Sequence, residues 1–125
     1  MILVDTSVWI DHLRANNETL AELLHGQAVL AHPFVVGELA LGNIRQRKTV
    51  LAALADLPRA EVATDAEVLA FVELHALFGR GIGYVDAHLL AAARLTAGAR
   101  LWTKDRRLHE VARDLGLAMM QRSGS

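Results

Sequence analysis

The chain has 125 residues, a usual length for one domain, and 53% of them are hydrophobic, which is enough to bury a core without disulfides or a structural metal. It contains no cysteine, which excludes disulfide frameworks, thiolate nucleophiles and cysteine-based zinc sites. Lys and Arg number 13 against 14 Asp and Glu, and the resulting net charge of −1 does not by itself indicate a nucleic-acid-binding protein.

Apolar runs alternate with helical patterns along the whole chain. In chain order we expect a strand at 2–4, helices at 8–14 and 18–24, a strand at 28–31, helices at 33–44 and 47–54, a strand at 60–62, helices at 66–78 and 84–97, a strand at 100–103, a helix at 106–115 and a weak strand at 117–120. Pro33 suits a first helical turn, and Asp65 can cap the helix that follows it. This alternation predicts an α/β fold with three layers, α/β/α, around a mainly parallel sheet of about five strands.

No internal repeat or linker interrupts this pattern. Residues 1–122 are expected to form a single domain, and 123–125 a flexible tail. No apolar run approaches the roughly 20 residues that span a bilayer. An acid interrupts the N-terminal apolar run at once, so no signal peptide is expected. We therefore expect a cytoplasmic protein with no membrane association.

Two acids stand where predicted strands end. Asp5 directly follows the strand at 2–4, and Asp105 comes shortly after the strand at 100–103. Ligand sites in parallel sheets lie beyond the carboxyl ends of the strands, so both side chains should lie at the same edge. The simpler alternative is a turn residue for Asp5 and a helix cap for Asp105.

Two further acids stand on predicted helices. Glu38 is the only polar side chain between Phe34 and Gly42, and helical spacing places it on an apolar face. A buried carboxylate needs a partner or a metal, unless the helix is turned so that Glu38 reaches solvent. Asp86 lies in the first turn of its helix, where the helix dipole alone would favour an acid.

Considered together, the four acids can meet above one edge of the sheet. Neighbouring carboxylates repel one another and raise each other's pKa, and a hard divalent cation relieves that repulsion. An all-oxygen set of ligands suits Mg²⁺ or Mn²⁺. The six histidines show no paired-ligand spacing that would offer another metal site. The residues predict a Mg²⁺ or Mn²⁺ site formed by Asp5, Glu38, Asp86 and Asp105.

Four segments resemble the motifs of the PIN-domain family, and within it the VapC-type toxins of prokaryotic toxin–antitoxin pairs. The likeness covers essentially the whole chain and rests on the segments 1–10, 35–39, 83–93 and 101–105. It implies a PIN-like fold and a metal-dependent endoribonuclease that hydrolyses RNA phosphodiester bonds. The family's catalytic acids correspond to Asp5, Glu38, Asp86 and Asp105.

The resemblance also implies roles within this site. The metal ligands would be Asp5, Asp86 and Asp105, while Glu38 would ligate the ion or orient the attacking water. The carboxylates would be supported by the hydroxyl groups of Thr6, Ser7 and Thr103. Many relatives carry a further acid after the fourth motif, where Arg106 and Arg107 stand here, so one ion is expected.

The partners that the resemblance implies are a VapB-type antitoxin, an RNA substrate (a transfer or ribosomal RNA) and a second copy in a homodimer. Lys104, Arg106 and Arg107 adjoin the site and are expected to contact phosphates, whereas a second basic cluster, at 45–48, is better explained as a solvated helix face. The apolar side chains at 20–24 and 50–54 could form the dimer interface or belong to the core.

Three alternatives compete with this interpretation. An aspartyl phosphotransferase similar to the haloacid dehalogenases would carry a second Asp where Ser7 stands, and a receiver domain would carry adjacent acids after the first strand. Both patterns are missing. The more serious alternative is a non-catalytic PIN-fold module that binds RNA or a protein partner, although four intact acids argue against it.

Overall fold

The computed structural model of the protein describes residues 1–120, and the expected tail, 123–125, lies outside them. Three parallel strands form the sheet: β1 (Ile2–Val4) is central, between β2 (Val29–Leu30) and β3 (Arg100–Trp102). Leu3 pairs with Leu30 on one side and with Leu101 on the other. The parallel sheet expected from the sequence is therefore present, with the first strand at its centre.

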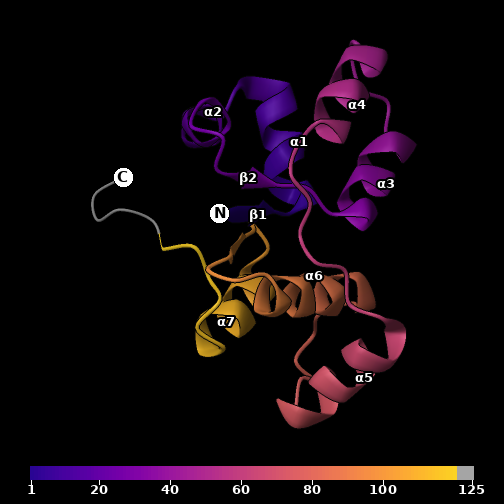
Figure 1. The fold of residues 1–125 in the computed structure, drawn as a ribbon, viewed down its shortest axis with the longest axis vertical. Coiled ribbons are helices and arrows are strands. Elements are labelled where there is room, and N and C mark those ends of the chain that lie inside the picture. The colour runs from indigo at the N-terminus through magenta and orange to yellow at the C-terminus, as the bar shows by residue number, and fades with distance from the viewer. Residues whose placement is uncertain (121–125) are drawn as a thin grey trace.

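Helices cover the sheet on both sides. They are α1 (Thr6–Ala15), α2 (Glu18–His25), α3 (Pro33–Leu41), α4 (Arg47–Ala55), α5 (Asp65–Leu74), α6 (Tyr84–Leu95) and α7 (Arg106–Asp114). Figure 1 shows α1–α4 on one side of the strands and α5–α7 on the other, with α5 packed against α6. This arrangement matches the three layers expected from the alternating pattern.

The sheet is narrower than the five strands expected from the sequence. Within residues 1–120, the positions of the other two strands form only isolated parallel bridges, one between Ala31 and Arg59 and one between Leu101 and Ala118. Each bridge consists of backbone hydrogen bonds to a single residue, Ala31 or Leu101. Pro58 has no N–H with which to extend the pairing at Ala31. The pattern of apolar residues therefore overestimated the length of these two edge strands.

All seven helices differ from their expected bounds, five of them by only one or two residues at an end, whereas α3 and α5 end three and four residues early. Thr64, and not Asp65, caps α5, because its hydroxyl accepts the Glu67 N–H while the Glu67 carboxylate accepts the Thr64 N–H. This helix ends at Leu74, before Ala76 takes a positive φ of 51°. The helix expected at 33–44 ends at Leu41, because Gly42 has an extended backbone.

The core surrounds β1. Leu3 and Val4 are fully buried, and Trp9 and Trp102 are each 5% exposed. The apolar segments at 20–24 and 50–54 also face the core: Leu20 and Leu54 are buried and their apolar neighbours pack against the same cluster. None of the helices within residues 1–120 has the length and apolar character needed to cross a membrane.

Candidate active site

The carboxyl ends of β1 and β3 place two acids at one edge of the sheet, as the sequence predicted. Asp5 follows β1 and is the N-cap residue of α1, and its backbone N–H donates to the Trp102 carbonyl of β3 at 2.9 Å. Asp105 caps α7 by accepting the Leu108 N–H at 2.9 Å. The cap proposed as the simpler explanation of Asp105 is thus present, at the same edge as Asp5.

Two hydroxyl groups hold the Asp5 carboxylate, which is 8% exposed. The Ser7 and Thr103 hydroxyls donate to the same oxygen, Oδ2, at 2.8 and 2.7 Å. Each hydroxyl in turn accepts a backbone N–H at 3.0 Å, Ser7 from Lys104 and Thr103 from Asp105. No donor within residues 1–120 binds Asp5 Oδ1, so this oxygen keeps its lone pairs for another partner.

Glu38 reaches solvent, which corrects the expectation of a buried face. The core side of α3 is formed by Val35 and Leu39, each 1% exposed, whereas Leu41 is 90% exposed. The helix is therefore turned, as the alternative for Glu38 required. Even so, the Thr6 hydroxyl donates to Glu38 Oε1 at 2.7 Å and holds this carboxylate against the start of α1.

Asp86, the fourth acid, lies where the charges of the other three act on its carboxylate. The half-buried Asp86 accepts the Gly83 N–H at 2.9 Å in the first turn of α6. Its pKa is raised, first by burial and then by the charges of Asp5, Asp105 and Glu38, although the Gly83 hydrogen bond opposes the rise. Asp86 therefore lies within range of the charges of the other three carboxylates.

The donor set fits a hydrated hard cation better than a tight cage of ligands. No group of three or more histidine, aspartate or glutamate side chains in residues 1–120 is arranged to hold a metal ion. Mg²⁺, however, usually keeps several waters and binds through one or two carboxylates. Asp5 Oδ1 can serve as an oxygen ligand. A cation would also relieve the repulsion between Asp86 and the neighbouring carboxylates.

Basic side chains border the site on the α7 side. A hollow of about 320 Å³ is lined by Thr103, Lys104, Asp105, Arg106, His109 and Met120. Lys104 pairs with Asp11 of α1 at 3.1 Å, and Arg106 lies 3.5 Å from Glu110. Arg107, expected beside them, packs its side chain against Gly81 and does not line the hollow.

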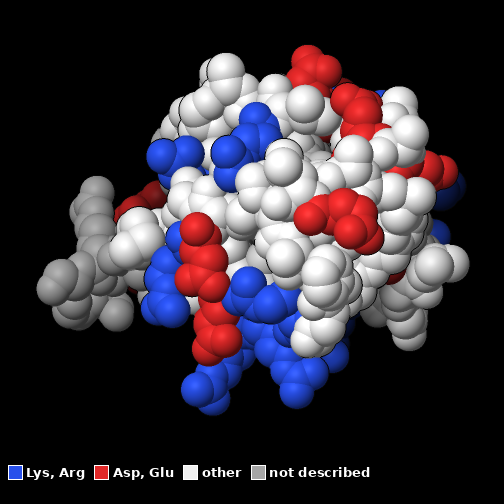
Figure 2. Space-filling model, turned by 90° about the horizontal axis from the view of Figure 1, so that it is seen from below, with Lys and Arg blue, Asp and Glu red and all other residues white. Residues whose placement is uncertain are grey.

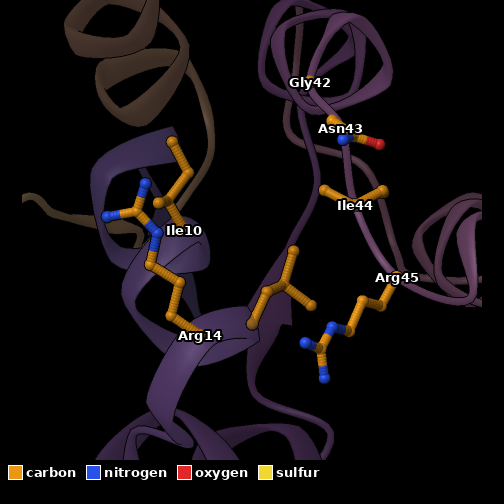
Figure 3. A pocket seen from close by; sticks show the side chains of 7 residues that line it. Ile10, Arg14, Gly42, Asn43, Ile44 and Arg45 are labelled. Atoms are coloured by element: carbon orange, nitrogen blue, oxygen red, sulfur yellow. The ribbon is translucent and has the colours of Figure 1, made fainter.

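A larger hollow lies between α1 and the segment that follows α3, as Figure 3 shows. It measures about 430 Å³ and is lined by Ile10, Leu13, Arg14, Gly42, Asn43, Ile44 and Arg45. Ile10 stands one helical turn after Thr6, and Gly42 directly follows the helix that carries Glu38, so the same two elements form the Thr6–Glu38 contact and the walls of the hollow.

Arg14 and Arg45 line the two walls of this larger hollow (Figure 3), and neither was predicted from the sequence to lie near the site. Neither forms a salt bridge with another described residue. Arg45 was assigned to a solvated helix face, and nothing local in the sequence distinguishes Arg14 from any other exposed helical arginine. Only the packing of α1 against α3 brings the two side chains together.

Comparisons with known proteins agree with this arrangement. The family model of the PIN domain matches residues 2–114. Ribonuclease VapC32 of two strains of Mycobacterium tuberculosis is 51% identical to this chain over 121 residues, which cover 97% of this chain and 98% of the relative. The crystal structure of FitAcB from Neisseria gonorrhoeae has a similar fold, with a TM-score of 0.62, 24% identity, and coverage of 90% of this chain and 94% of that one.

Proposed function

Because the chain belongs to the PIN-domain family, we propose that it is a VapC-type endoribonuclease, the toxin of a toxin–antitoxin pair, which hydrolyses RNA at its four-carboxylate site. The observation that carries this proposal is the position of Asp5 and Asp105 at one edge of the sheet, with two hydroxyls on Asp5 Oδ2 and no described donor on Oδ1. Grouping four acids, with Asp5 buried and Asp86 half-buried, is costly in a protein that only binds RNA or a partner, whereas a metal-dependent nuclease needs such a group.

One divalent ion, Mg²⁺ or Mn²⁺, would be held by Asp5 together with Asp86 or Asp105, in part through water. Bound there, it supplies Lewis-acid polarisation of the scissile phosphate and lowers the pKa of a bound water. Arg106 and Arg107 occupy the positions after Asp105, so the chain offers no further acid there for a second ion.

The protein's own side chains prepare this site. Ser7 and Thr103 fix the Asp5 carboxylate through Oδ2 and leave Oδ1 for the ion. Thr6 holds Glu38 through Oε1, so that the other oxygen can accept a hydrogen bond from the attacking water. These three hydroxyls therefore orient carboxylates and need not touch the RNA.

The RNA backbone would follow the two hollows that border the acids. Lys104 and Arg106 line one hollow, and Arg14 and Arg45 line the other. Guanidinium groups bind phosphates and stack on unpaired bases, and Ile10, Leu13 and Ile44 offer an apolar floor for a base. The strand would thus be held on both sides of the scissile phosphate.

Cleavage of a transfer and ribosomal RNA mixture tests the activity. Purified protein should cut RNA with Mg²⁺ or Mn²⁺ and lose cutting in excess EDTA. Asp5→Asn should abolish cleavage, whereas Asp114→Asn, at an exposed acid on the last turn of α7, should leave it unchanged. Cleavage at the full rate in EDTA, or by the Asp5 variant, would contradict the proposal and favour the non-catalytic module or a contaminating nuclease.

We also assign the protein partners that such a toxin requires. A VapB-type antitoxin should relieve toxicity when it is co-expressed from the neighbouring small gene. Homodimer formation would use the exposed apolar side chains of α5 and the turn after it: Leu69, Leu74 and Phe78 are 59%, 78% and 63% exposed. Sedimentation of the wild type and of Leu74→Asp tests the dimer, and equal masses for the two proteins would exclude this surface.

A further inference from the structure

The corner between α3 and α4, residues 42–46, is closed without the usual local caps. α3 has no basic side chain in its last turn, and Gly42, which follows it, has an extended backbone instead of the left-handed one of a common C-cap. α4 begins after Gln46, which has a φ of 51° and whose side chain caps no backbone N–H within residues 1–120. The corner therefore needs another source of hydrogen bonds to satisfy the end of α3.

Arg47 supplies these hydrogen bonds from the first turn of α4. Its guanidinium group donates through Nη1 to the Gly42 carbonyl at 3.1 Å and through Nη2 to the Ala40 carbonyl. Both carbonyls lie at the end of α3, where backbone acceptors lack helical partners and the helix dipole favours a positive charge. The planar fork of the guanidinium can bind both oxygens at once, whereas the ammonium group of a lysine is a single point of charge.

The same corner forms one wall of the larger hollow. Gly42, Asn43, Ile44 and Arg45 line this wall, opposite Arg14 of α1 (Figure 3). Arg47 is not a lining residue, but the carbonyl that it binds belongs to Gly42. Its contacts therefore act on the backbone that leads into Arg45.

We propose that Arg47 is a positioning residue for RNA binding, which holds the corner in the shape that places Arg45 across the hollow from Arg14. Arg47 acts through the two carbonyls and through Arg45, and it does not contact the RNA. The effect on RNA binding rests on the proposed function, because that function assigns the hollow to the RNA path. The link between Arg47 and the shape of the corner does not rest on it.

A direct phosphate contact is the alternative role for an exposed arginine such as Arg47. The two roles differ in what a positive charge alone can do. Arg47→Lys keeps the charge but loses the rigid pair of donors. A phosphate contact would largely survive this change, whereas the double hydrogen bond to the end of α3 would not.

RNA binding at several salt concentrations separates the two roles. Fluorescence anisotropy of a labelled single-stranded RNA, with every protein carrying Asp5→Asn, measures affinity without cleavage. Arg47→Lys should weaken binding about fivefold and lower the slope of log K against log salt by about 0.7, the value of one phosphate contact, because the displaced corner withdraws Arg45. Arg45→Lys, the matched control, should retain the slope. An unchanged slope in Arg47→Lys would overturn the proposal.

A double-mutant cycle tests whether Arg47 acts through Arg45. Once Arg45→Ala is present, Arg47→Lys should weaken RNA binding by less than about twofold, because the side chain that it positions is gone. Lys48→Ala removes a neighbouring charge from the same helix and should have the same effect with or without Arg45→Ala. If Arg47→Lys weakens binding equally in both backgrounds, Arg47 does not act through Arg45 and the proposal is wrong.

Nitrogen-15 relaxation of the backbone amides tests the corner without RNA. Arg47→Lys should lower the order parameters of residues 43–45, while those of residues 10–14 in the opposite wall stay as in the wild type. Lys48→Ala should change neither wall. Unchanged order parameters at 43–45 in Arg47→Lys would overturn the proposal. Wild-type protein that neither binds nor cuts RNA, yet shows the expected response of the corner, would contradict the proposed function and leave the link between Arg47 and the corner intact.

Discussion

At the scale of single residues, each carboxylate of the site has its own type of partner. Asp5 is held by two side-chain hydroxyls, Glu38 by one, Asp86 by a backbone N–H of its own helical turn, and Asp105 by the N–H of Leu108. Hydrogen bonds to the charged form lower a carboxyl pKa, whereas burial and like charges raise it. At Asp86 burial and the neighbouring charges prevail.

Replacing Asp86 by Asn should stabilise the metal-free protein while abolishing cleavage. An acid whose folded pKa is raised binds its proton more tightly in the fold, so its charge costs stability above its ordinary pKa of 3.8. Asn removes that charge and still accepts the Gly83 N–H. We expect a gain below about 1 kcal/mol at pH 7, since solvent screens the half-buried site. Urea titration measures it, and a clear loss of stability would mean that Asp86 is a structural acceptor.

His32 should make the fold sensitive to mild acid. Its pKa is lowered from 6.5 to about 4 in the fold, so the unfolded chain takes up a proton before the folded chain does. The stability that this ring contributes is therefore full above pH 6.5 and is lost as the pH falls toward 4. Urea midpoints measured from pH 7 to pH 4.5 should fall less steeply in His32→Asn than in the wild type. Parallel curves would show that other groups cause the acid sensitivity.

At the scale of secondary-structure elements, the Ser7 and Thr103 hydroxyls join two strand–helix units. Ser7 lies at the start of α1, directly after β1, and Thr103 lies between β3 and α7. Both donate to Asp5 and accept backbone N–H groups from the turn that leads into α7. The spacing of Asp5 and Asp105 thus depends on a contact between residues 96 positions apart in the chain.

Thr103→Val should weaken this connection. Valine fills the buried space of threonine but leaves the Asp5 carboxylate with one donor fewer and the Asp105 N–H without its acceptor. We expect a loss of about 1–3 kcal/mol in the free energy of unfolding, together with reduced cleavage. Thr103→Ser retains the hydroxyl and should recover most of the activity. A fully active valine variant would show that Ser7 alone orients Asp5.

At the scale of the whole molecule, a net charge of −1 conceals local separation of charge. Figure 2 shows Lys and Arg side chains gathered toward the lower edge of one face, with Asp and Glu more widely spread. The two hollows beside the acids each carry a pair of basic side chains. Attraction of a polyanion depends on such local fields, and the net charge therefore does not argue against an RNA substrate.

Metal should stabilise the folded protein. An ion that binds only the folded state raises the free energy of unfolding by about 2.7 kcal/mol at 100 times its dissociation constant. Mg²⁺ or Mn²⁺ should therefore raise the melting temperature of the wild type, and EDTA should reverse the change. Asp5→Asn should show no such rise, whereas Asp114→Asn should behave as the wild type. An equal rise in the Asp5 variant would place the ion elsewhere.

RNA binding should lose salt dependence when the basic side chains of the hollows are removed. Each phosphate contact contributes about 0.7 to the slope of log K against log salt for a single strand. The variants Arg14→Ala with Arg45→Ala, and Lys104→Ala with Arg106→Ala, should each flatten the slope, measured with catalytically inactive Asp5→Asn protein. Arg113→Ala, at the other end of α7, is the control. An unchanged slope would remove that hollow from the RNA path.

The sequence by itself determined the family and the parallel α/β order, and it predicted the four acids proposed to form the site. These features are local: an apolar run followed by Asp5, or a helix start containing Asp86, can be recognised from a few neighbouring residues. Local patterns overestimated the length of the outer strands and misjudged the exposure of Glu38. The pairing of an edge strand and the rotation of a helix depend on the neighbouring elements that pack against them.

Only the tertiary structure decided how the acids are held and what borders them. The hydroxyl contacts to Asp5 and Glu38, the hollow between Arg14 and Arg45, and the edge-on packing of Phe34 against His88 all join residues far apart in the chain. No local pattern encodes such contacts, because their distances follow from how α1, α3, α6 and β3 pack around the sheet. The position of each acid along the chain was therefore predictable from the sequence, whereas its hydrogen-bond partner and its exposure were set by packing.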